Sequence, residues 1–249
     1  MLTVVAWNVN SLRARLPLVR QYLAAYEPDV LCLQETRIAD AAFPHDVLAD
    51  EGYVVATTCS GSRAGVAIAS RIPIDETVVG LPGFAADRRI ACRIAGVWID
   101  TVYVPTRTAI GKVEFLDALH DDQVARFADA PLVLCGDFNI CFDARDYASP
   151  SLISAPDVHP NRPEDLAFRR LVGDRLIDCL RVRTDETGHF TWFPMTPWAL
   201  RRNYGMRLDY VFATPPLAQR LVELAHDRDV RQWPRPSDHV PMRARFERP

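Results

Sequence analysis

The sequence is built around short apolar segments that resemble buried strands and that end in carboxylate or amide side chains. Residues 2–7 lead into Asn8 and Asn10, and residues 30–33 lead into Glu35. Asparagine is a poor strand former, so the two asparagines either make turns or serve a site. Because strand ends on one edge of a sheet meet at a shared cleft, the pattern predicts a sheet with a polar site along one edge.

Helices and strands alternate early in the chain, and strands follow one another more closely later. Apolar residues at helical spacing predict helices over residues 11–26, 112–127 and 164–171. Residues 143–163 form a proline-containing loop that is too long for a bare connector. We therefore expect one α/β domain, residues 1–249, with sheets covered by helices. Further strands are predicted over residues 53–57, 65–70, 90–94, 97–104, 131–135, 190–192, 207–213, 222–229 and 240–246.

Composition excludes several other classes of protein. No stretch approaches the roughly 20 apolar residues of a membrane span, and the first residues lack the pattern of a signal peptide. The six cysteines are scattered without a CxxC pair, which favours reduced core thiols and a cytoplasmic protein. The net charge of −3 does not suggest a general polyanion binder, although clustered arginines can serve an acidic protein.

Further polar residues follow the later strands. Asp137 and Asn139 come after residues 131–135, Asp209 lies within the predicted strand 207–213, and Asp238 and His239 precede the last strand. Each has a structural explanation of its own, as a turn, a cap or a buried pair. Taken together, oxygen ligands of this kind suit Mg²⁺ or Mn²⁺, and the absence of a Cys/His cluster argues against structural zinc.

Six short motifs in order give the chain a recognisable signature. They are WNVNSLRARL, LQETR, GVAIASR, GDFNI, RLDY and PSDHVP. In this order they resemble the exonuclease III family of AP endonucleases, within the endonuclease/exonuclease/phosphatase superfamily that includes deoxyribonuclease I. The resemblance runs from Leu2 to Phe246. It implies a four-layer α/β sandwich, deoxyribonuclease I-like, in which two facing mixed β-sheets are flanked by helices.

The resemblance also implies an activity: metal-dependent cleavage of duplex DNA 5′ to abasic sites, with possible 3′–5′ exonuclease or 3′-phosphodiesterase activity. The partner would be duplex DNA with abasic sites or 3′ ends, the cofactor Mg²⁺ (with Mn²⁺ as an alternative), and the protein a monomer without membrane contact. An alternative is a superfamily phosphodiesterase or phosphatase that acts on RNA, a nucleotide or a small phosphoester. A descendant that binds DNA or protein without catalysis is a third, and it would require loss of site residues that are all present.

Residue roles follow from the matched motifs. Glu35 resembles the principal metal ligand, and Asp137 resembles the residue that activates water. Asn139 would hold Asp137 and the phosphate, while Asp209 would orient His239 against a phosphate oxygen. The remaining expected metal contacts are Asn8, Asn10 and Asp238, with Asp137 and Asn139 nearby, and Tyr103 would lie near the leaving group.

Substrate recognition is where this sequence departs from its relatives. The loop after Tyr103 is short, residues 143–163 lack the usual pattern, and residues 194–202 are atypical. Aromatic and apolar side chains at the matched positions would form a pocket for the base-less sugar, which excludes an intact nucleotide by size. These are Trp192, Phe193 and Met206, with Arg88, Arg89, Arg201 and Arg202 as candidate phosphate contacts or, equally, as a solvated charged face.

Overall fold

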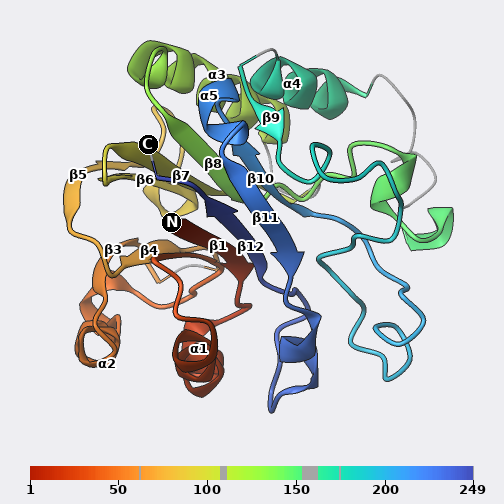
Figure 1. Ribbon diagram of the computed structural model, residues 1–249, viewed down its shortest axis with the longest axis horizontal. Coiled ribbons are helices and arrows are strands. Elements are labelled where there is room, and N and C mark those ends of the chain that lie inside the picture. Colours follow the sequence, from red (N-terminus) through yellow and green to blue (C-terminus); the bar gives the residue numbers. More distant parts are fainter. Residues whose placement is uncertain (62, 107–110, 153–161, 174, 249) are drawn as a thin grey trace.

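The computed structural model describes residues 1–61, 63–106, 111–152, 162–173 and 175–248. Two six-stranded sheets face each other at the centre of the molecule, and helices cover their outer faces (Figure 1). Both sheets contain parallel and antiparallel pairs, so both are mixed.

The first sheet has the strand order β11-β12-β1-β2-β4-β3. Its central strand β1 pairs in parallel with β2 and antiparallel with β12. Asn8 stands opposite Gln34 in this register, so the polar ends of β1 and β2 lie side by side. The strands are β1 (Leu2–Asn8), β2 (Val30–Gln34), β3 (Val54–Thr58), β4 (Val66–Ser70), β11 (Leu221–His226) and β12 (Met242–Phe246).

The second sheet has the strand order β5-β6-β7-β8-β10-β9. Strand β8 lies between β7 and β10, with Asp137 opposite both Tyr103 and Asp209. Three predicted site residues therefore meet at one end of this sheet. The strands are β5 (Ile74–Val79), β6 (Arg89–Ile94), β7 (Val97–Tyr103), β8 (Leu132–Asp137), β9 (Ile177–Asp178) and β10 (Asp209–Ala213).

Alternating side chains of β1 show how the four layers form. Val4 and Ala6 face the core between the two sheets, where they meet residues such as Val133 and Val211 of the second sheet. Val5 and Trp7 face the opposite side and pack against α1 (Leu12–Tyr26). A strand with apolar side chains on both faces must be covered on both, and the predicted four-layer α/β sandwich is confirmed.

The outer face of the second sheet is covered by two helices that pack on each other. Phe115 and Leu119 of α3 (Lys112–Phe127) and Phe168 of α4 (Pro163–Val172) join β7, β8 and β10 in one apolar cluster. Figure 1 shows these helices on the opposite side of the molecule from α1 and α2. Two short helices are α2 (His45–Asp50) and α5 (Pro215–Ala218), and the 3-10 helices are η1 (Asp40–Ala42), η2 (Ala86–Arg88), η3 (Ala144–Asp146), η4 (Pro150–Leu152) and η6 (Arg228–Gln232).

Several boundaries differ from the prediction. The strand expected over residues 190–192 is wrong, because Trp192 makes only isolated bridges to Met206 and His239. Asp209 begins β10 instead of lying inside a strand. Strand β5 was not predicted, because it is an edge strand with mostly exposed side chains and therefore little apolar signal. Much of the 143–163 loop lies outside the described residues.

The cysteines and the helices agree with the composition. All six cysteines are free, and all but Cys141 are buried. No helix within the described part of the chain is long and apolar enough to cross a bilayer.

Candidate active site

The asparagine at the end of β1 connects two acidic groups from different sheets. Asn8 Nδ2 donates to Glu35 Oε1 and to Asp137 Oδ2, both at 2.8 Å. Asn8 Oδ1 accepts the backbone N–H of Asn10 at 3.0 Å. Asn8 is fully buried, and these hydrogen bonds satisfy its amide inside the protein. It holds the Glu35 and Asp137 carboxylates next to each other.

Glu35 has a left-handed backbone conformation, with φ of 52°. That conformation costs a non-glycine residue about 1–2 kcal/mol. Hydrogen bonds from the neighbouring loop hold it: Ser11 N–H donates to the Glu35 carbonyl at 2.8 Å, and Thr36 N–H donates to the Gly65 carbonyl at 3.0 Å. The side chain also pairs with Arg37. The loop therefore fixes the direction in which the Glu35 carboxylate points.

Asn10 and Asp238 form the second side of the site. Asn10 Nδ2 donates to Asp238 Oδ1 at 2.9 Å, and Trp192 Nε1 donates to Asp238 Oδ2 at 2.9 Å. Burial opposes ionisation of Asp238, but His239 and these two donors hold its pKa below the ordinary value. The carboxylate is therefore ionised at neutral pH.

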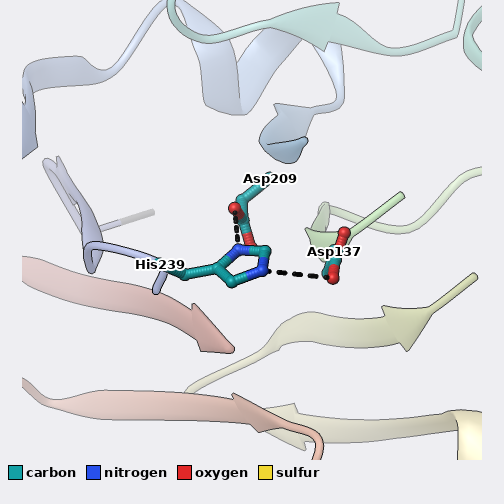
Figure 2. Close-up of side chains that lie close together, drawn as sticks. All are labelled: Asp137, Asp209 and His239. Atoms are coloured by element: carbon teal, nitrogen blue, oxygen red, sulfur yellow. Dashed lines mark hydrogen bonds and ion pairs between the residues drawn. The ribbon is translucent and has the colours of Figure 1, made fainter. Parts of the chain in front are cut away.

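Asp209 and His239 form a close buried pair (Figure 2). His239 Nδ1 lies 2.7 Å from Asp209 Oδ2, and its Nε2 faces Asp137 Oδ2 at 3.9 Å. Burial lowers the pKa of His239, but the charges of Asp209, Asp137 and Asp238 outweigh it and raise that pKa to about 10. The imidazole is therefore protonated at neutral pH, and both its nitrogens are donors.

Asp137 has a carboxylate suited to accept a proton. Burial, and then the charge of Asp209, raise its pKa to about 7, against the opposing effects of His239 and Asn8. The backbone N–H of Asn139 donates to Asp137 Oδ1 at 2.9 Å. Asn139 Nδ2 donates to the Val104 carbonyl at 3.0 Å, so its side chain holds the turn in place.

Tyr103 completes the group from β7. Burial, followed by the charges of Glu35 and Asp137, raises the pKa of its hydroxyl, so the phenol stays protonated. Arg88 Nη1 donates to the Tyr103 carbonyl at 3.2 Å, and its guanidinium lies 5.1 Å from the centre of the Tyr103 ring. Arg88 is therefore placed to orient Tyr103.

Two of the three expected pocket residues border the site. Trp192 is half-buried and bonded to Asp238, and Met206 pairs with Trp192 through the backbone. Phe193 does not line an open pocket, because it is completely buried in a small core with Phe190. Its ring packs in this core directly after Trp192 in the sequence.

The arginines divide into three cases. Arg89 cannot contact DNA, because its side chain is buried and paired with Asp100 and Asp122, each at 2.9 Å. This part of the expectation is wrong, since a buried guanidinium needs carboxylate partners and has found them. Arg201 and Arg202 are exposed. Arg88 is half-buried beside Tyr103.

Sequence reasoning missed several supporting residues. Lys112 Nζ donates to the Asn139 carbonyl at 2.7 Å. Ser237 Oγ donates to the Asn8 carbonyl at 2.7 Å and accepts the His239 N–H at 3.2 Å. Thr191 Oγ1 accepts the Asp209 N–H at 3.0 Å. Two of them carried a signal that could have marked them: Lys112 is the single lysine of the chain, and Ser237 lies inside the PSDHVP motif.

The charges of the site fit a divalent cation. Among the described residues, the ion pairs to the four carboxylates of the site come from two cationic side chains, so the carboxylates outnumber their direct cationic partners in a largely buried place. Asp209 Oδ1 is buried without a hydrogen-bond partner among the described residues. Buried carboxylates of this kind need a compensating cation. The groups are Glu35, Asp137, Asp209 and Asp238, with Arg37 and His239.

Comparison with known proteins gives the family. The model of the Endonuclease/Exonuclease/phosphatase family matches residues 5–239. Exodeoxyribonuclease III of Haemophilus influenzae is 27% identical to this chain, and the alignment covers 98% of this chain and 99% of the relative. The chain belongs to the exonuclease III family.

Two solved structures are especially similar. An AP endonuclease from Archaeoglobus fulgidus is 32% identical with a TM-score of 0.92, and the match covers 99% of this chain and 100% of that one. The 3′ phosphatase NExo from Neisseria, bound to a product DNA hairpin, is 31% identical with a TM-score of 0.92 and the same coverage. The two are equally similar to this chain, so overall similarity does not choose between their activities.

The Asp209–His239 pair leads to a prediction about pH. A His with a raised pKa in the folded state stabilises the fold below about pH 6.5, and this contribution is lost as the pH rises through about 10. In the metal-free protein, Asp209→Asn should lower the His239 pKa and flatten this part of the stability profile. Denaturant unfolding between pH 6 and 10, with NMR titration of the His239 ring, measures both effects. Asp75→Asn, at an exposed position on β5, is the control, and identical His239 titrations in all three proteins would contradict the prediction.

Proposed function

We propose that this protein cleaves the phosphodiester bond 5′ to abasic sites in duplex DNA, using Mg²⁺ as its cofactor, with Mn²⁺ as an alternative. That it is a DNA repair nuclease agrees with relatives such as exodeoxyribonuclease III and the AP endonucleases. Dependence on a divalent metal is typical of the family, while the choice of Mg²⁺ and of abasic sites is our proposal. The observation that carries the proposal is the convergence of Glu35, Asp137 and His239 around Asn8.

The metal would be held by the oxygen-rich side of the site. Glu35 is the central ligand of this proposal, with Asp238 across the site and Asn10 between Asp238 and the end of β1. Asn8, Asp137 and Asn139 complete the expected set. A bound divalent ion neutralises charge on the phosphoryl oxygens and favours departure of the leaving oxygen. Because the Asn8 Nδ2 group already serves Glu35 and Asp137, we assign Asn8 chiefly to positioning these two carboxylates.

Hydrolysis requires a proton acceptor and donors to the phosphate. Asp137, with its pKa near neutral, takes the proton from the attacking water. His239, kept protonated by Asp209, donates through Nε2 to a non-bridging phosphate oxygen. Tyr103 keeps its proton and can donate to the phosphate or to the leaving oxygen. Each of these residues comes from a strand end or its adjoining loop, so the fold positions them before substrate arrives.

Abasic specificity would depend on the wall beside Asp238. Trp192 and Met206 offer an apolar surface to the flipped, base-less sugar, and Phe193 supports it from behind. Flipping an abasic nucleotide sacrifices no base pair, so a small apolar pocket can select it. We further propose that residues 1–249 act as one catalytic domain and as a monomer.

The first experiment uses a 5′-labelled duplex with one abasic-site analogue. With Mg²⁺ we expect a single cut on the 5′ side of the lesion, no cut in the undamaged duplex at the same enzyme concentration, and no cut in EDTA. Mn²⁺ and Ca²⁺ in parallel define the metal. Failure to cut the lesion, together with hydrolysis of RNA or small phosphodiesters, would reject the abasic proposal in favour of the alternative superfamily activity.

Processing of 3′ ends is the second candidate function. It is favoured by the similarity to the 3′ phosphatase and to the 3′–5′ exonuclease of Neisseria, which has a TM-score of 0.91 and 31% identity. The same reactions should therefore include a duplex with a recessed 3′ phosphate. Release of phosphate faster than incision of the abasic duplex would make 3′-end processing the main activity.

A further inference from the structure

A cavity of about 560 Å³ lies next to the candidate active site and outside it. It is open to solvent on one side and is lined by the loop that follows Phe193 and by η6. Three of its lining residues are Arg201, Arg228 and Arg231, and no carboxylate is among the described residues that line it. The cavity is therefore strongly positive, in a chain whose net charge is −3.

Two of these arginines are half-buried without an ion-pair partner within the described ranges. Arg228 Nη2 donates to the Leu200 carbonyl at 2.9 Å, and the guanidinium lies 5.1 Å from the centre of the Phe193 ring. Arg231 Nη1 donates to the Ser237 carbonyl at 3.0 Å, while its Nε is buried without a hydrogen-bond partner there. Burial lowers the pKa of both guanidinium groups, and only Asp238 partly offsets this, at Arg231. Both nevertheless stay charged, so the cavity holds two guanidinium groups that form no ion pair with any described carboxylate.

The acidic residues nearest in sequence are engaged elsewhere. Asp227 accepts the Tyr22 hydroxyl at 2.6 Å and pairs with Arg243 at 3.2 Å. Asp229 accepts the Tyr26 hydroxyl at 2.7 Å. Both carboxylates therefore point to α1 and β12 and not to the cavity. Arg228 and Arg231 differ in this respect from Arg89, a buried structural arginine that forms ion pairs with two aspartates.

The cavity is connected to the active site through short segments of backbone. Arg231 holds the carbonyl of Ser237, the residue before Asp238. Arg228 packs on Phe193, the residue after Trp192. On the outer side of the same loop, Trp198 is 38% exposed and lies 5.7 Å from the Arg202 guanidinium. Trp198 and Arg202 lie outside the described lining of the cavity, in the same loop as Arg201. An exposed aromatic ring close to arginines is typical of protein surfaces that bind the bases and backbone of nucleic acids.

We propose that the cavity lined by Arg201, Arg228 and Arg231 is a second phosphate-binding site, which receives a phosphate group beyond the one that is cleaved. Guanidinium groups match the geometry of phosphate oxygens, and the volume admits a phosphate with its sugar. The phosphate comes from the backbone of DNA bound at the active site or from a free phosphate or phosphomonoester. The DNA assignment rests on the proposed function, whereas the anion site does not.

The test uses binding by the metal-free protein in EDTA, so that no cleavage is required. Arg201→Glu is the main variant, because Arg201 is exposed and its side chain makes no hydrogen bond to any residue in the described part of the chain. Arg228→Ala is a second variant, with circular dichroism to verify folding. Arg93→Glu, an exposed position on β6, makes the same charge change and is the matched control.

Fluorescence anisotropy with the abasic duplex is measured from 50 to 300 mM salt, and inorganic phosphate is titrated by NMR. If the site holds a DNA phosphate, Arg201→Glu weakens binding about tenfold and reduces the slope of log Kd against log salt by about one. If the site holds free phosphate, Arg201→Glu binds DNA as well as the Arg93→Glu control does. The NMR chemical-shift changes that inorganic phosphate causes in the wild-type protein are then absent from Arg201→Glu. Variants that match Arg93→Glu in both measurements would overturn the site. Wild-type protein that binds DNA through these arginines but leaves the abasic duplex uncut would reject the proposed function alone.

Discussion

Asp137→Asn is expected to reduce cleavage of the preferred DNA substrate by about 10³-fold or more while the protein stays folded. Removal of a general base typically costs 10²–10⁴ in rate, and this residue also contributes a negative charge to the proposed metal site. Asparagine keeps the size of the side chain that Asn8 and the Asn139 N–H contact. Single-turnover cleavage with saturating enzyme and Mg²⁺ measures the loss at the chemical step.

The matched control is Asp146→Asn, since Asp146, the last residue of η3, is also a buried aspartate but forms an ion pair with Arg181. It should affect stability more than chemistry, because its carboxylate compensates a cation and touches no site residue described above. Thermal melts of both variants show whether each is folded. An Asp137→Asn protein that is folded and retains wild-type single-turnover rates would remove Asp137 from its assigned role.

Gly136→Ala is expected to destabilise the fold by at least about 3 kcal/mol, or to prevent expression of soluble protein. Gly136 has φ of 132°, and a Cβ there would lie 2.2 Å from the Val102 carbonyl oxygen. Relief of this clash requires β7 and β8 to separate where Tyr103 stands opposite Asp137. Overpacking and an unfavourable backbone each cost about 1–3 kcal/mol, and here they act together.

Gly96→Ala is the control for the backbone contribution. Gly96 also has positive φ, 79°, but nothing lies within 4 Å of a Cβ placed there. It should cost only about 1–2 kcal/mol. Urea unfolding of both variants separates the cost of the backbone conformation from the cost of the contact with Val102. Equal losses in the free energy of unfolding would show that the contact with Val102 does not contribute. In thermal unfolding, a loss of about 1 kcal/mol lowers the midpoint temperature of a protein of this size by about 2–4 °C. The midpoint temperature of Gly136→Ala should therefore fall by about 10 °C.

Much of the fold followed from local patterns. Leu2 to Trp7 is apolar at every position but Thr3, which indicates a strand covered on both faces, and it lies at the centre of a sheet. The helices at 12–26 and 112–127 begin and end within one residue of the predicted bounds, because their apolar residues recur at regular helical spacing. Strand β5, with sequence IDETVV, carried no such pattern, since an edge strand buries little.

The candidate site was anticipated in part because its residues stand directly after apolar strands. Glu35, Asp137 and His239 could be named from motifs, and the structure brings them together. The motifs did not indicate that Phe193 and Arg89 are buried. Whether a side chain faces a cleft or a core depends on what packs over it, and for Phe193 that is Ala199 and Val240 from other segments.

The order of strands, the polar residues at their ends and the family motifs are properties of the sequence alone. They limit this chain to a two-sheet nuclease scaffold with an oxygen-rich site. The protonation of His239, the near-neutral pKa of Asp137 and the positive cavity around Arg228 exist only in the folded protein. Each depends on burial and on charges that are distant in sequence, because desolvation and Coulomb interactions act through space and not along the chain.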